Sequence, residues 1–151
     1  MRFRIAAAFA LTAATSLEAQ TITDLGTATP IAGDWTYAAT MDGSEAKFLD
    51  ASANPQIILH CTRGTRQITI AKPATAAAPS INVWTSSQTR SVPASFDPTA
   101  ARLAFSLTNY DPLLDAISTS RGRIAFSVGT QPALVVPAWP EIARVVEDCR
   151  A

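Results

Sequence analysis

Histidine is almost missing from this chain, because His60 is the only one among 151 residues. A single histidine excludes a zinc site built from several histidines. A Ser-His-Asp triad would have to use His60, and the Gly-x-Ser-x-Gly pattern of a nucleophile elbow is absent. Cys61 follows directly, but neighbouring residues on a strand point to opposite faces, so a catalytic thiolate–imidazole pair is not expected. The alternative for His60 is an outward-facing side chain on a strand, and we favour it.

An excess of positive charge is also lacking, since twelve lysines and arginines are matched by twelve aspartates and glutamates. Nucleic-acid binding is therefore not expected, because the phosphate backbone is held by basic side chains. Hydrophobic residues make up 48% of the chain and charged residues 16%, a balance that favours a packed core over disorder. No ligand pattern for a metal or a cofactor is present, so we predict neither, and we predict no enzyme activity.

Hydrophobic runs long enough to span a bilayer are missing as well. The N-terminal run at residues 5–14 has about ten residues, whereas a spanning helix needs about 20. It follows Arg2 and Arg4 and precedes the small residues of 16–19, which is the order of a signal peptide cleaved after Ala19. The alternative is a buried N-terminal helix. The pattern predicts export to the periplasm without membrane insertion.

The chain is accordingly divided into a signal peptide at 1–19, an irregular lead-in at 20–33 and a single β-rich domain at 34–151. Cleavage would remove two arginines and one glutamate, which leaves ten basic and eleven acidic side chains. Both cysteines stay in the mature chain, and two cysteines in an exported protein predict one disulfide.

The two cysteines occupy matching positions on two predicted apolar faces. Cys61 ends a strand on the face of Ile57 and Leu59, and Cys149 ends the apolar face of a C-terminal helix. These faces meet when the helix packs on the sheet. We therefore predict a Cys61–Cys149 bond; the alternative is two buried free thiols.

Short alternating runs separated by turn residues dominate the rest of the sequence. Asp42-Gly43 is typical of a hairpin turn. Asp111-Pro112 predicts the start of a short helix, and Trp139-Pro140 opens the final one. We expect a mainly β fold: an antiparallel β-sandwich or flattened barrel of about nine short strands, with a short internal helix and a C-terminal helix. The expected strands fall in 35–41, 46–48, 56–61, 67–71, 81–86, 89–92, 103–107, 124–128 and 133–136.

Two carboxylates lie four residues apart at the predicted internal helix. Asp111 and Asp115 could share a face, and paired carboxylates do acid–base work or bind calcium. Helix capping explains Asp111, however, and the positive end of the helix explains Asp115. We favour these structural roles.

Two arginine pairs flank glycines in predicted loops. Arg121 and Arg123 surround Gly122, while Arg63 and Arg66 lie on either side of Gly64. Either pair could hold an anion through bidentate hydrogen bonds. The alternative is charge placed at strand ends, which blunts sheet edges.

The three tryptophans differ in their expected surroundings. Trp35 and Trp139 are expected to be core anchors. Trp84 lies on the strand face opposite Ile81 and Val83, so it is the best tryptophan candidate for a binding surface. We predict a partner-binding surface at Trp84 together with Arg121 and Arg123.

The layout from Trp35 to Cys149 resembles small periplasmic β-sandwich proteins of Gram-negative bacteria. The resemblance is carried by a Trp-x-Tyr strand before Asp42-Gly43, a strand ending in Cys61 and a late strand and helix ending in Cys149. The chain is similar to the invasion-associated locus B family and to accessory periplasmic proteins of type VI secretion. Its segments 111–123 and 137–150 look more like an alphaproteobacterial family of uncharacterised function. The resemblance implies fold and compartment only.

Two classes of function follow. We expect a non-enzymatic binding or accessory protein of the cell envelope, whose partner is another envelope or secretion protein. The alternative is a small periplasmic hydrolase or an inhibitor of one. Convergence of His60, Asp111 and Asp115 in one pocket would favour the enzyme.

Overall fold

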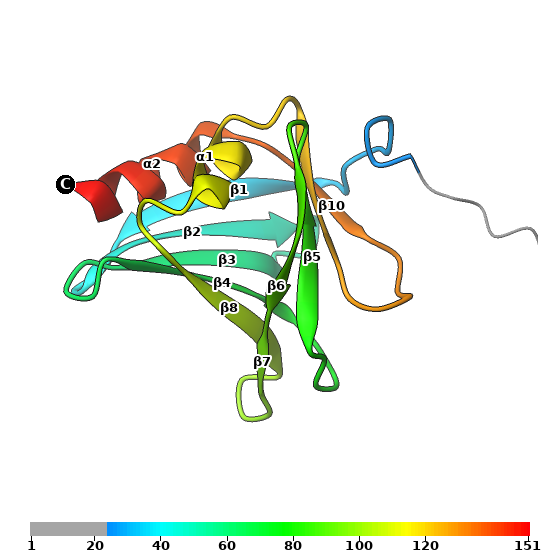
Figure 1. Ribbon diagram of the computed structural model, residues 1–151, viewed down its shortest axis with the longest axis horizontal. Coiled ribbons are helices and arrows are strands. Elements are labelled where there is room, and N and C mark those ends of the chain that lie inside the picture. Colours follow the sequence, from blue (N-terminus) through cyan, green and yellow to red (C-terminus); the bar gives the residue numbers. More distant parts are fainter. Residues whose placement is uncertain (1–23) are drawn as a thin grey trace, which may run out of the picture.

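The computed structural model describes residues 24–151, and the predicted signal peptide lies outside the described residues. Within them, ten strands form two antiparallel sheets, accompanied by two helices (Figure 1). Sheet A has the order β1 (Gly33–Ala39), β2 (Gly43–Asp50), β3 (Pro55–Thr62), β4 (Gln67–Pro73), β8 (Arg102–Thr108) and β7 (Ser95–Asp97). Sheet B has the order β10 (Leu134–Pro137), β9 (Arg123–Ser127), β5 (Ser80–Trp84) and β6 (Thr89–Pro93). The helices are α1 (Pro112–Ser118) and α2 (Pro140–Arg150). This arrangement confirms the expected mainly β fold, and the described strands do not close into a barrel.

Side-chain alternation builds one core between the two sheets and the helices. Every second residue of sheet A points inward, and these residues join the inner residues of sheet B and the apolar faces of α1 and α2 in a single cluster. Trp35 is buried there, with its ring edge against Phe48 at a centroid distance of 5.5 Å. Its Nε1 donates a hydrogen bond of 2.7 Å to the carbonyl of Pro137, which ties β1 to the end of β10. The expected role of Trp35 as a core anchor is confirmed.

The last helix is fixed to sheet A by the predicted disulfide. Cys61 on β3 and Cys149 on α2 are bonded, with their Cα atoms 5.6 Å apart and both side chains fully buried. On the neighbouring edge, Tyr37 of β1 donates a hydrogen bond to Asp148, and the Arg144 guanidinium lies 3.8 Å from the centre of the Tyr37 ring. The hydrogen bond to Asp148 raises the pKa of Tyr37. Arg144 and Asp148 of α2 thus contact β1.

Several local expectations were wrong. Trp139 is 39% exposed, because it is the residue that precedes α2 rather than a core anchor. Met41 was placed on the strand face of Trp35, but β1 ends at Ala39 and Met41 lies in the turn. The short strand β7 was not expected, since three residues are too few to display an alternation.

Gly43 offers a test of how tightly β2 and β3 approach each other. A Cβ atom at this position would lie closer than 3.0 Å to the carbonyl oxygen of Cys61. Because backbone rather than a flexible side chain would have to move, Gly43→Ala should lower the free energy of unfolding by at least about 1 kcal/mol. Denaturant unfolding followed by circular dichroism measures the loss. Gly64→Ala is the matched control, as its Cβ meets nothing within 4 Å; an equal effect of both variants would contradict the close approach.

Candidate functional site

Four chain segments meet at one end of sheet A, on the left of Figure 1 beside the C-terminus. They are the β1–β2 turn, the β3–β4 turn, the loop between β8 and α1, and the last turn of α2. The amide of Arg63 donates to the carbonyl of Asp42 at 2.8 Å, which joins the two turns. The amide of Asn109 donates to the carbonyl of Arg66 at 3.0 Å, and Arg150 Nε donates to the carbonyl of Asn109 at 2.8 Å. These bonds connect the four segments into one surface.

This surface, which we call the hairpin end, presents Met41, Arg63, Arg66, Tyr110 and Arg150. Met41 is fully exposed and Tyr110 is 65% exposed. The Arg150 guanidinium lies 5.2 Å from the centre of the Tyr110 ring. Methionine, tyrosine and arginine are the side chains enriched at protein–protein interfaces. Two large apolar side chains in water beside arginines therefore make this end a candidate recognition surface.

Two arginines of the hairpin end carry positive charges that no carboxylate within residues 24–151 neutralises. Arg63 and Arg66 are exposed, and neither forms an ion pair with another residue in 24–151. Arg150 is paired, because its Nη2 lies 2.8 Å from Oδ1 of Asp115. Two unpaired guanidinium groups can each accept a carboxylate through two parallel hydrogen bonds. The hairpin end thus suits a partner with acidic side chains.

The disulfide anchors the part of the hairpin end that carries Tyr110. Asn109 is buried, and its side-chain amide donates to the carbonyl of Cys149 at 3.1 Å. The loop that carries Tyr110 is therefore attached to the residue that the Cys61–Cys149 bond anchors. A disulfide at the base of a loop reduces the conformational freedom that binding would otherwise have to remove.

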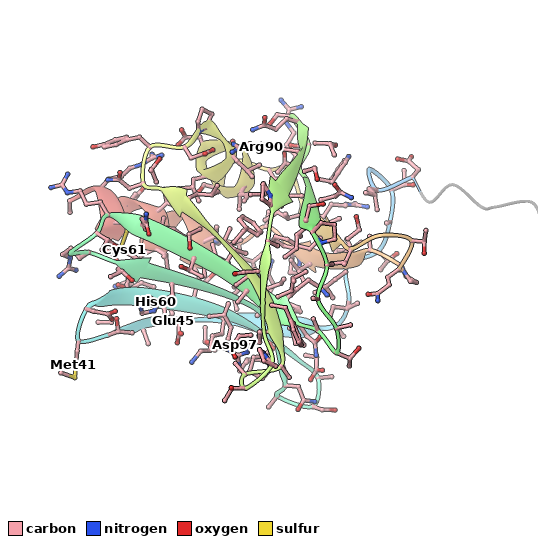
Figure 2. All side chains as sticks on the ribbon, turned by 60° about the horizontal axis from the view of Figure 1, so that its bottom comes forward. Met41, Glu45, His60, Cys61, Arg90 and Asp97 are labelled. Carbon is pink, nitrogen blue, oxygen red and sulfur yellow. A yellow bond between two sulfur atoms is a disulfide. The ribbon has the colours of Figure 1, made fainter. Side chains whose placement is uncertain are left out.

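His60 lies on the outer face of sheet A, as expected, opposite Glu45 of β2 (Figure 2). Its Nε2 is 3.0 Å from Oδ2 of Asp42, and its Nδ1 is 3.9 Å from Oε2 of Glu45. The hydrogen bond to His60 lowers the pKa of Asp42, with a smaller contribution from Thr40. The histidine thus holds the β1–β2 turn that displays Met41.

Asp111 has the capping role that we favoured, and Asp115 lies in the first turn of α1, as expected. Asp111 caps the helix, since its Oδ1 accepts a hydrogen bond of 2.8 Å from the amide of Leu113. The same carboxylate forms two hydrogen bonds with the Arg90 guanidinium, at 2.6 and 3.1 Å. Asp115 pairs with Arg150. Both lie on the helix side of sheet A, whereas His60 is on its outer face, so the structure does not bring the three groups together.

The partner-binding positions expected from sequence lie around sheet B. Trp84 and Arg123 share its outer face, where Trp84 is half-buried opposite Ala125. Arg123 is also half-buried, and its Nη1 donates to the carbonyl of Ala28. Arg121 is exposed in the loop between α1 and β9, with its amide bonded to Ser86 Oγ at 2.8 Å. Of the three side chains, only that of Arg121 extends freely into solvent.

The hairpin end was only partly visible in the sequence. The Arg63 and Arg66 pair was noted as a possible anion site, but Met41 was assigned to a strand and Tyr110 was not considered. The signal that identifies Met41 is its position directly before Asp42-Gly43, because this dipeptide is typical of a hairpin turn and places Met41 in the turn rather than in a strand. Tyr110 directly precedes the Asp111-Pro112 helix start, which likewise places it in a loop.

Two further findings concern residues 24–151 alone. No group of three or more histidine, cysteine, aspartate or glutamate side chains there is arranged to hold a metal ion. None of the helices in this range is both long and apolar enough to cross a membrane.

Comparisons with protein-family models, with curated proteins and with solved structures found no match to this chain. The functional assignment therefore rests on the geometry described above.

Proposed function

We propose that this chain is an exported, non-enzymatic binding protein of the periplasm that recognises an envelope or secretion protein through the hairpin end. The observation that carries the proposal is the exposure of Met41 and Tyr110 beside Arg63 and Arg66. Exposed apolar side chains rimmed by charge are typical of interaction sites. Such anchors dominate binding energy when a partner covers them.

The proposed compartment is supported by two independent features. The buried Cys61–Cys149 bond is of the kind that forms and persists outside the reducing cytoplasm. The order of charged, apolar and small residues in 1–19 is that of a signal peptide. Intact mass of the protein from a periplasmic extract tests this part, and a chain that begins near Gln20 is expected.

The partner is expected to present carboxylates around a pocket for an apolar side chain. The two unpaired arginines supply the charge complement, and Met41 is a flexible side chain that adapts to irregular pockets. A hydrolase is less favoured, because His60 lies on the outer face of sheet A, whereas Asp111 and Asp115 lie on its helix side.

The double variant Met41→Asp/Arg63→Glu tests the recognition surface. It removes the apolar anchor and reverses one charge on an exposed turn, so the fold should be retained while capture of the partner falls about tenfold or more. The measurement is quantitative recovery of co-purifying envelope proteins from periplasmic extract, with the melting temperature of each variant recorded.

The matched control carries the same kinds of change on sheet B. Trp84→Ala/Arg121→Glu removes the apolar and charged groups of the surface expected from the sequence. It should leave recovery near that of the unaltered protein. Loss of capture in this control, together with normal capture by Met41→Asp/Arg63→Glu, would move the interface to sheet B and refute the hairpin end.

A further inference from the structure

A cavity lies at the end of the sandwich opposite the hairpin end. It is lined by the end of β4 and the loop after it, the residue before β8 and the β9–β10 loop. The β4–β5 and β9–β10 loops lie at the lower right of Figure 1. Its volume is about 400 Å³, which is within the range of small-molecule sites.

Among residues 24–151, Lys72 contributes the only ammonium group to the lining of this cavity. It follows Ile68 and Ile70 on the inner face of β4, where both isoleucines are buried and the cross-strand neighbour of Lys72 is Leu103. Strand alternation therefore directs a lysine toward the core at the point where the core opens to solvent. If position 72 served packing alone, an apolar residue would be sufficient there.

The charge of Lys72 has no carboxylate partner within residues 24–151. Its Nζ donates one hydrogen bond of 3.0 Å to the carbonyl of the adjacent Pro73, which leaves two donors of the ammonium group for other acceptors. Partial burial lowers the pKa of Lys72. An anion bound beside the ammonium group would favour its charged form and so raise the pKa of Lys72 again.

The rest of the lining fits the body of an aliphatic ligand. Pro73, Val128 and the alanines of the loop after β4 are small and apolar, so they leave space against the lysine rather than filling it. Gln131 adds a side-chain amide that can donate a second hydrogen bond. One cation, the Gln131 amide, the Thr75 hydroxyl and an apolar wall match a ligand with a single anionic head and a short hydrocarbon body.

We propose that this cavity binds a short aliphatic monocarboxylate, with its carboxylate on the Lys72 ammonium group and its hydrocarbon body against the alanine wall. The site is separate from the hairpin end, and the inference does not depend on the proposed partner recognition. The two can therefore be tested, and can fail, independently.

Titration with sodium octanoate, followed by amide chemical shifts, tests the site. Shifts are expected in residues 74–78 and 128–131, with saturation, and octan-1-ol should bind at least tenfold more weakly because it lacks the charge. The chain has only two lysines, Lys47 and Lys72, and Lys47 pairs with Glu45 on the outer face of sheet A. Lys72→Gln should weaken octanoate binding at least tenfold, while Lys47→Gln should bind as the unaltered protein does.

A second variant covers the case in which Lys72→Gln disturbs the fold. Ala76→Phe fills the cavity from an exposed loop position and keeps the lysine, so it should also block octanoate. Unchanged binding by both Lys72→Gln and Ala76→Phe, equal binding of octan-1-ol, or no saturable shift in the cavity lining would overturn the proposal.

Discussion

Cys61→Ala/Cys149→Ala is expected to lower the free energy of unfolding by about 4–5 kcal/mol, which is the largest effect that we predict for any substitution. The bond joins residues 88 positions apart, and the chain-entropy account of disulfides gives this figure for a loop of that length. Net stabilities of single domains are about 5–15 kcal/mol. We therefore expect the disulfide to supply a large share of the stability of this fold.

The melting temperature measured by circular dichroism should fall by roughly 10–20 °C in the double variant. Reduction of the unaltered protein should reproduce most of this fall, whereas the cysteine-free variant should not respond to reductant. A variant that melts within a few degrees of the oxidised protein would show that the other contacts of α2 hold it without the disulfide.

Asp111→Ala is expected to cost about 2 kcal/mol of stability, because one carboxylate has two structural roles. It caps α1 through the amide of Leu113, and loss of such a cap typically costs about 1 kcal/mol. It also holds Arg90 of β6 through two hydrogen bonds. The Arg90 side chain is 39% exposed, so solvent screening limits the ion pair to about 1 kcal/mol.

A conservative variant separates the two roles of Asp111. Asparagine retains an oxygen that can cap the helix but removes the charge, so Asp111→Asn should lose roughly half as much stability as Asp111→Ala. Arg90→Gln should leave the cap intact and match the loss in Asp111→Asn. Equal losses in all three variants would contradict the division into a cap and an ion pair.

The pH dependence of stability gives an independent check on Asp111. Burial would raise the pKa of Asp111, but the hydrogen bonds from Arg90 and from the Leu113 amide, with the charge of Arg90, lower it overall. A carboxyl whose pKa is lower in the folded state contributes stability above its unfolded value, about pH 3.9, and loses it as the pH falls through the folded value. The difference in unfolding free energy between the unaltered protein and Asp111→Asn should thus be constant near neutral pH and shrink below about pH 4.

Much of the architecture could be predicted because it depends on residues close together in the chain. Alternation identified the inner face of β3, and the Asp111-Pro112 pair identified the first turn of α1. Trp139 was misplaced because a residue that precedes a helix can face either the core or solvent, and the local pattern is the same in both cases. Trp84 was correctly placed on the outer face, but its half-burial depends on its neighbours across sheet B.

The sequence by itself determined the disulfide, since only two cysteines exist and each ends an apolar face. It also determined the outward direction of His60, because strand alternation is a local property. Only the tertiary structure decided that Met41, Tyr110 and the arginines share one surface, and that Lys72 opens into a cavity. These features arise where segments far apart in the chain come into contact, and no local periodicity specifies which loops meet at the ends of a sandwich.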